Sequence, residues 1–355
     1  MSFPHAKYFT PVVLAFAVAI FCAPPARAAQ AIHSLERIKL GGLDQSILIR
    51  GRDVSKPLLL FLHGGPGIPE MPISYVNRDL ERDFIVVHWD QRGAGKSYSP
   101  GIAASQMKLE NFVSDTEQLT RYLLRRFHQR KLYLVGYSWG SLVGALAVAR
   151  SPELFHAYMG ISQLVNVDES SRLLYVQALG RARGQGDQPA LEKLAALGSS
   201  PHKNPNNKPA FDTIKKSLIA GKVAHPLTPW HYTALAFVSP YYTIEDDVRL
   251  TKGMAFSQKA THDDLYGANL MRSVPELDVP VYIFEGRYDT ILSPVLSERY
   301  FKKLRAPSGK HLIWFEHSGH SLHIEEREKY RAMMRQVLRD TQPVDHLPLK
   351  GRPPA

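Results

Sequence analysis

Cysteine is nearly absent from this chain, whose 355 residues contain a single one, Cys22. It ends an apolar run, Pro11–Cys22, which follows Lys7 and precedes the small-residue pattern Ala26-Arg27-Ala28. This order predicts a signal peptide over residues 1–28, cleaved after Ala28, and therefore a periplasmic or secreted protein. The chain that remains has no cysteine, so it can form no disulfide and must be stabilised by packing alone.

A long hydrophobic run is also missing. The apolar run of 12 residues before Ala28 is too short to span a bilayer, which needs about 20 apolar residues, so we expect no stable membrane insertion after cleavage. Loss of Lys7 and Arg27 lowers the formal net charge from +11 to +9. The basic residues are scattered and no nucleic-acid motif is present, which favours a solvated surface over a nucleic-acid partner.

The order of apolar and helical segments predicts an α/β fold with a mostly parallel sheet flanked by helices. Residues 36–50 are typical of two paired strands joined at Gly41-Gly42, and buried-type strands follow from residue 57. We expect four parts along the chain, which are a signal peptide (1–28), a core (29–161 and 276–340), an inserted, mainly helical cap (162–275) and a disordered tail (341–355).

The segment Lys131–Gly140 is the most informative stretch. An apolar strand leads into Gly136-Tyr137-Ser138-Trp139-Gly140, and a helical segment follows directly. This order is typical of the nucleophile elbow of α/β-hydrolases, a tight strand-to-helix turn that exposes a serine hydroxyl. The alternative is an ordinary turn, because Gly and Ser are common in turns, but the placement between strand and helix favours Ser138 as a nucleophile.

Two further apolar segments of strand length deliver Asp289 and His320 at or just beyond their C-terminal ends. Serine, acid and histidine in this chain order are typical of the α/β-hydrolase fold, and they predict Ser138, Asp289 and His320 as a catalytic triad. His317 and His323 compete with His320, but Ser318-Gly319 favours His320 on an exposed turn. Since no cysteine or acidic motif joins the three histidines, we expect no metal.

The strand from Leu58 runs into His63-Gly64-Gly65-Pro66-Gly67. In this fold one oxyanion-hole donor comes from such a loop and the other from the residue after the nucleophile. We therefore predict the backbone N–H groups of Gly65 and Trp139 as donors, with Gly64 as the alternative in the loop. A phosphate-binding loop would require a Gly-Lys-Ser/Thr ending, which this segment lacks.

These motifs, together with Asp90-Gln-Arg-Gly-x-Gly-x-Ser97 and Gly286-Arg-Tyr-Asp289, resemble those of the proline iminopeptidase family of α/β-hydrolases. The resemblance runs from about residue 36 to 340 and implies hydrolysis of an amide or ester by Ser138, Asp289 and His320. It also implies that the 90–97 block is a structural loop near the site. Position 137 departs from the family, which typically has Gly there.

The cap departs further, because the family's tryptophan- and glutamate-bearing helix for the substrate amine has no counterpart between residues 162 and 275. The proline specificity is therefore not implied. Gln163, Asp168 and Glu169 begin the cap, where they are expected to overhang Ser138 and could bind substrate; the acids could equally stabilise a helix N-terminus. Four cap aromatics could line the pocket or only hold the cap together: Tyr232, Phe237, Tyr241 and Tyr242.

The sequence thus predicts a secreted serine hydrolase that acts through an acyl-enzyme on a small-molecule or short-peptide substrate, without a cofactor. An aminopeptidase of the proline iminopeptidase type is slightly favoured over a carboxylesterase or lactonase with the same triad. A non-catalytic binding protein of the same fold is the alternative from another class. Dehalogenase and epoxide hydrolase chemistry is disfavoured, since those relatives use an acid in place of Ser138. The oligomeric state is left open.

Overall fold

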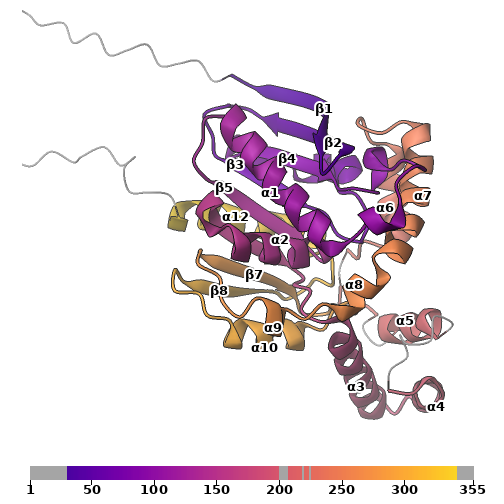
Figure 1. Ribbon diagram of the computed structural model, residues 1–355. Helices are drawn as coiled ribbons and strands as arrows, with labels where there is room; N and C mark the ends of the chain where they lie inside the picture. Colours follow the sequence, from indigo (N-terminus) through magenta and orange to yellow (C-terminus); the bar gives the residue numbers. More distant parts are fainter. Residues whose placement is uncertain (1–29, 200–206, 218–219, 224, 342–355) are drawn as a thin grey trace, which may run out of the picture.

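The computed structural model describes residues 30–199, 207–217, 220–223 and 225–341 (Figure 1). The predicted signal peptide, and the predicted tail beyond residue 341, lie outside the described residues. No helix within these ranges is both long enough and apolar enough to cross a membrane.

The strands form one sheet in the order β1-β2-β4-β3-β5-β6-β7-β8. The pairs β1–β2 and β2–β4 are antiparallel and all other pairs are parallel, which confirms the predicted mostly parallel sheet. The predicted entry hairpin is present, with Gly41-Gly42 between its strands. The strands are β1 Ile32–Leu40, β2 Leu43–Gly51, β3 Leu58–Leu62, β4 Ile85–Asp90, β5 Leu132–Tyr137, β6 Phe155–Ile161, β7 Val281–Gly286 and β8 Lys310–Phe315.

The central strands are apolar at successive positions because both faces of the sheet are covered. Leu58, Leu60 and Leu62 of β3 join the core on the face of α1, α2 and α10, whereas Leu59 and Phe61 join the core on the face of η1 and α12. Elements outside the cap are η1 Met71–Arg82, η2 Gly95–Ser97, η3 Ala104–Gln106, α1 Leu109–Arg126, α2 Trp139–Arg150, η4 Pro152–Leu154, α10 Pro294–Lys303, α11 Leu322–Glu325 and α12 Arg327–Thr341.

The chain between β6 and β7 is helical and forms two parts. Helices α3, α4 and α5 share a small apolar core of their own, which includes Tyr175, Leu194 and Phe211. Helices α6 and α7 pack instead against η1 and η2, near the N-terminal half of the sheet (Figure 1). The helices are α3 Val167–Gln185, α4 Gln188–Leu197, α5 Lys208–Ser217, α6 Pro229–Phe237, α7 Ile244–Ala260, α8 His262–Gly267 and α9 Leu270–Ser273.

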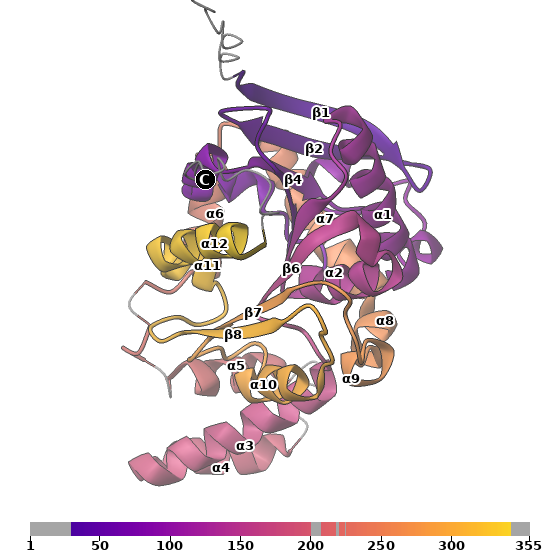
Figure 2. The same cartoon turned by 90° about the vertical axis from the view of Figure 1, so that its left-hand side faces the viewer.

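Parallel pairing brings the carboxyl ends of β3 to β8 to one edge of the sheet. Leu62 is paired with Gly136, and Gly136 with Gly160, so the segments after β3, β5 and β6 leave the sheet side by side. β7 and β8 continue the series and end together, with Gly286 opposite Phe315 (Figure 2). Side chains that follow these strands therefore meet at one place.

Candidate active site

Ser138 lies at the turn between β5 and α2. Its backbone has φ 52° and ψ −115°, a strained conformation for a residue with a side chain, and its N–H donates to the carbonyl of Ile161 at 2.9 Å. Two close approaches explain the flanking glycines. A Cβ on Gly136 would lie 2.4 Å from the carbonyl oxygen of Gly140, and a Cβ on Gly140 would lie 2.1 Å from that of Leu62. Only glycine at both positions allows this turn.

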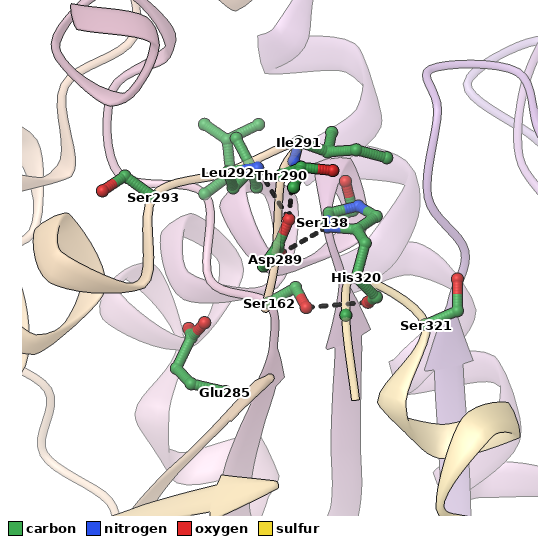
Figure 3. A network of polar contacts seen from close by, with 12 residues as sticks. Ser138, Ser162, Glu285, Asp289, Thr290, Ile291, Leu292, Ser293, His320 and Ser321 are labelled. Carbon is green, nitrogen blue, oxygen red and sulfur yellow. Dashed lines mark hydrogen bonds and ion pairs between the residues drawn. The ribbon is translucent and has the colours of Figure 1, made fainter. Parts of the chain in front are cut away.

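Asp289 and His320 form a hydrogen-bonded pair beyond β7 and β8. Asp289 Oδ1 accepts from the N–H groups of Ile291 at 2.7 Å and Leu292 at 3.0 Å, and its Oδ2 lies 2.7 Å from His320 Nδ1. The Asp289 side chain is fully buried. Because its other oxygen is fixed by backbone donors, the carboxylate holds the imidazole in one orientation (Figure 3).

The His320 ring lies between the Asp289 carboxylate and the Ser138 side chain, as Figure 3 shows. The structure thus brings together the three residues of the predicted triad. Ser162 Oγ donates to the His320 carbonyl at 2.8 Å and fixes the main chain of the same turn.

The other two histidines have different surroundings. His317 is exposed, and its backbone N–H donates to Glu326. His323 is 1% exposed, and its Nε2 lies 3.0 Å from Glu70 Oε1. Of the three competing histidines, His320 alone faces both Asp289 and Ser138. Among the described residues, no group of three or more His, Cys, Asp or Glu side chains could hold a metal.

The glycine loop after β3 lies against the elbow. A Cβ on Gly64 would be 3.3 Å from Ser138 Cβ, so the backbone of this loop directly contacts the serine. Gly65 follows with φ 118° and a cis bond to Pro66. Trp139 is the first residue of α2, where a helix has no internal acceptor for its N–H groups. The glycine loop and the start of α2 thus both adjoin Ser138.

Gln91 connects these two sides. Its backbone N–H donates to His63 Nε2 at 3.1 Å, and its side-chain amide donates to the His63 carbonyl at 3.0 Å. Its Oε1 accepts from the Trp139 indole at 3.1 Å. One buried side chain therefore fixes both the start of the glycine loop and the residue after Ser138. The family resemblance implied that Gln91 lies in a structural loop, but only the tertiary structure reveals this bridge.

His63 is itself held as a neutral ring. Burial lowers its pKa to about 4, and its Nδ1 lies 2.7 Å from the Gly64 carbonyl. Since Nε2 accepts from Gln91, Nδ1 carries the proton and donates to Gly64. The histidine before the glycines is thus a fixed support for the loop.

Tyr137 occupies the position where the resembling family typically has glycine. Its ring centroid lies 5.2 Å from that of His320 and 4.6 Å from that of His323. Its hydroxyl is 2.8 Å from Ser321 Oγ, and burial raises its pKa well above the ordinary value. Tyr137 therefore packs against the imidazole next to Ser138 and stays neutral.

The structure corrects the prediction that Gln163 binds substrate. Its side chain is 1% exposed and fully hydrogen-bonded, donating to Ser141 Oγ and the Leu164 carbonyl and accepting from Tyr158. Its backbone N–H donates to Glu285, whose pKa is raised well above its ordinary value by burial. Gln163 thus supports the packing beneath the elbow.

Asp168 and Glu169 lie in the first turn of α3. The N-cap is Asn166, whose side chain accepts from the Glu169 N–H at 2.8 Å. The Glu169 carboxylate lies 3.6 Å from Arg299 of α10. The positive end of the α3 dipole stabilises both carboxylates at this position. Glu169 also forms an ion pair with Arg299 on a helix of the core.

The four cap aromatics separate into three environments. The Tyr232 hydroxyl donates to the Pro69 carbonyl at 2.6 Å, next to the glycine loop. Tyr241 and Tyr242 are buried, and Tyr242 donates to Asp90 at 2.5 Å. Phe237 is 69% exposed, which favours neither of the two expected roles, lining the pocket or holding the cap together. An aromatic-rich segment does not reveal which of its side chains faces the core.

No sequence motif indicated a role for Glu325 near the site. Its two oxygens accept from the N–H of Leu227 in the cap at 3.2 Å and from the N–H of Gly319 at 2.7 Å, and burial raises its pKa. It therefore ties the cap to the turn that carries His320. An acid five residues after His320 was the only signal for it.

Comparison with known proteins agrees with this geometry. Residues 57–327 match the model of the alpha/beta hydrolase fold family, and the chain therefore belongs to that family. A probable aminopeptidase YbaC of Bacillus subtilis (strain 168) is 35% identical over 305 residues, covering 84% of this chain and 93% of that protein.

A proline iminopeptidase of Clostridioides difficile (strain 630) is 24% identical over 291 residues, covering 80% of this chain and 89% of its own. The crystal structure of a proline iminopeptidase-related protein from Thermus thermophilus superimposes with a TM-score of 0.60 at 20% identity, covering 87% of this chain and 98% of that one. The resemblance to the proline iminopeptidases is confirmed, and the protein is a hydrolase of the α/β fold.

Proposed function

We propose that this protein is a serine hydrolase that removes the N-terminal residue of short peptides, as an aminopeptidase of the proline iminopeptidase type. The observation that carries the proposal is the alignment of Ser138, the His320 imidazole and the Asp289 carboxylate at the carboxyl edge of the sheet. The aminopeptidase and iminopeptidase names of its relatives support the substrate class.

In this mechanism His320 Nε2 takes the proton of the Ser138 hydroxyl as its oxygen attacks the substrate carbonyl. Asp289 holds the proton on His320 Nδ1, which leaves Nε2 free to accept. The N–H groups of Trp139 and of Gly65 or Gly64 stabilise the oxyanion. His320 then protonates the departing amine. In the second half, His320 takes a proton from water as the water oxygen attacks the acyl carbonyl, and it returns that proton to Ser138 Oγ when the bond to the serine breaks.

An aminopeptidase must also recognise a protonated amine. Burying such a charge without a partner costs several kcal/mol, so a carboxylate is required. We assign this role to Asp168 or Glu169, at the start of the cap. Glu169 already faces Arg299 at 3.6 Å, in a pair whose side chains are 37% and 52% exposed. An exposed pair of this kind is weak enough for a substrate amine to compete with it.

A carboxylesterase is the second candidate, and one observation favours it. Tyr137 and Tyr232 place aromatic rings beside His320 and the glycine loop, where an uncharged acyl or aryl group could pack. An ester has no amine to pair, so this candidate does not depend on the acids of α3.

Covalent labelling with a fluorophosphonate probe tests the serine chemistry. The wild type should be labelled, and Ser138→Ala should be unlabelled and about 10⁴- to 10⁶-fold lower in kcat. Ser99→Ala, at an exposed loop serine, is the matched control and should label as the wild type does. Equal labelling of Ser138→Ala and wild type would overturn the mechanism, and an unlabelled, inactive wild type would favour the binding-protein alternative.

Paired substrates decide between peptidase and esterase. Blocking the amine of a prolyl anilide should lower kcat/KM by about thirtyfold, equivalent to about 2 kcal/mol. Glu169→Gln or Asp168→Asn should remove much of that difference, whereas Asp187→Asn, at the N-cap of α4, should leave it unchanged. Equal rates for blocked and free anilides, with rapid cleavage of aryl esters, would establish the esterase.

We also propose that the protein acts in the periplasm or outside the cell, after cleavage behind Ala28. The short apolar run and the small residues at positions 26 and 28 support this. Sequencing of the exported protein should give Ala29 as its first residue. Retention of Met1 would show an uncleaved leader.

A further inference from the structure

The cap carries an exposed apolar surface that the proposed mechanism does not use. On α6, Trp230 is 76% and Phe237 69% exposed, and Val238, which follows, is 67% exposed. Ile244 and Val248, in the first turns of the next helix, α7, are 75% and 48% exposed. These five residues, named here the cap ridge, account for most of the large exposed apolar side chains among the described residues.

Helix geometry places the two aromatic residues of the ridge on one side of α6. Trp230 and Phe237 are seven residues apart, or two turns, so they share a face of α6. The opposite face of α6 is bound to the core, since Tyr232 donates to the Pro69 carbonyl at 2.6 Å and the Leu235 carbonyl accepts from Tyr75 at 3.1 Å. These two hydrogen bonds hold α6 against the segment that follows the glycine loop, so its exposed face points away from the core.

A cationic hollow of about 470 Å³ adjoins the ridge. Val248 belongs to both, and the hollow is also lined by Arg37 of β1, Tyr98, and Arg249 and Lys252 of α7. Glu245 is the acid in the lining, and it pairs with Arg249 at 2.6 Å. Three cations against one acid leave a net positive hollow beside the apolar side chains.

We propose that the cap ridge and the cationic hollow together bind the surface of an anionic phospholipid bilayer. Aromatic and aliphatic side chains insert at the level of the headgroups, and adjacent Lys and Arg side chains pair with the phosphates. The formal net charge of +9, which remains after the loss of Lys7 and Arg27, adds a general attraction to such a surface.

Charge complementarity favours lipid over a second copy of the chain. In a symmetric dimer the same surface would face itself, so the hollow with Arg37, Arg249 and Lys252 would oppose its own positive charge. An anionic bilayer offers the opposite charge next to an apolar layer, and it matches both halves of the surface. Docking in this way would turn the cap side of the candidate active site towards the membrane.

Tryptophan fluorescence with vesicles of defined composition tests the proposal. The chain has four tryptophans, none of them in residues 1–28, and Trp89 and Trp139 are 1% and 0% exposed. Vesicles of phosphatidylcholine with about one third phosphatidylglycerol should shift the emission to shorter wavelength, and Trp230→Phe should abolish that shift. Pure phosphatidylcholine should bind at least about tenfold more weakly.

Two sets of variants separate the halves of the surface. Phe237→Ser with Ile244→Ser should weaken co-sedimentation with anionic vesicles at least about tenfold, and Arg249→Gln with Lys252→Gln should remove the preference for anionic lipid. Val176→Ser, 63% exposed on α3, is the matched control and should bind as the wild type does. Unchanged far-ultraviolet circular dichroism of each variant checks that it is folded.

Three results would overturn the proposal. One is a wild-type emission that no vesicle shifts. Another is Val176→Ser losing as much vesicle binding as the Phe237→Ser, Ile244→Ser variant. The third is a wild-type dimer in analytical ultracentrifugation that Phe237→Ser dissociates, which would assign the ridge to a second copy.

Discussion

Asp90 is a buried acid whose protonation should change the stability of the fold in a measurable way. It is fully buried, accepts from Tyr242 at 2.5 Å and from the Lys96 N–H at 2.9 Å, and has a second oxygen without a partner in the structure described. Burial raises its pKa from 3.8 to about 7, although Lys96 acts in the opposite direction. The folded protein therefore holds this proton much more tightly than the unfolded chain does.

Whether stability rises or falls with pH depends on which state, folded or unfolded, binds the Asp90 proton more tightly. Because the folded pKa is the higher one, the contribution of Asp90 to stability is fully present below about pH 4 and is lost as the pH rises to about 7. At about 1.4 kcal/mol per pKa unit, the whole loss is about 4 kcal/mol. Between pH 5 and pH 8 we expect about 3 kcal/mol.

Asp90→Asn cannot ionise, so it should lack this dependence. The assay is urea unfolding followed by fluorescence, at intervals from pH 5 to pH 8, for the wild type and the variant. The free energy of unfolding of the wild type minus that of the variant should fall by about 3 kcal/mol across the range. His63 and His88, whose pKa values burial lowers to about 4 and about 3, titrate in both proteins and cancel in the difference.

Asp278→Asn, at an exposed position, serves as the matched control and should run parallel to the wild type at every pH. If Asp90→Asn also runs parallel to the wild type, Asp90 is ionised in the fold and the reasoning from its burial is refuted.

Three further substitutions have expected outcomes. Asp289→Asn should lower kcat about 10⁴-fold while leaving the fold intact, because the new amide would donate to His320 Nδ1 and force the wrong tautomer. Steady-state kinetics measures the loss, and unchanged circular dichroism shows that the variant is folded. A kcat near that of the wild type would contradict the prediction. Gln91→Leu should lower kcat about 10²-fold with little change in KM, because the glycine loop and Trp139, the two sides of the predicted oxyanion hole, lose their common hydrogen-bond partner. A change confined to KM would assign Gln91 to substrate binding instead. Asp115→Ala should lower the free energy of unfolding by about 3 to 5 kcal/mol in urea titration, because it removes the carboxylate that pairs with the buried Arg92 guanidinium. A loss below about 1 kcal/mol would show that water replaces the carboxylate.

The sequence predicted the features whose signal lies in one short segment of the chain. Apolar strands that end in a glycine turn, an acid or a histidine indicate both the sheet and its reactive edge, because each signal lies within about ten residues of chain. Ser138, Asp289 and His320 could be found in this way without knowing how the strands are ordered.

What the sequence did not predict depends on the direction of single side chains. Gln163 directly follows the strand end, but its amide turns inwards because Ser141 and Tyr158 satisfy it there. Phe237 and Tyr242 lie in one aromatic-rich segment, yet one faces solvent and the other reaches Asp90. The bridge through Gln91 joins residues from three segments and has no sequence pattern of its own.

The order in which the strands are synthesised has a consequence for when hydrolysis can begin. β8 is the last strand of the sheet and lies at its edge, and His320 follows it. Until β8 has joined the sheet, a partly folded chain has no histidine held beside Ser138 to accept the hydroxyl proton. In the proposed mechanism, activity therefore starts only when the final strand docks.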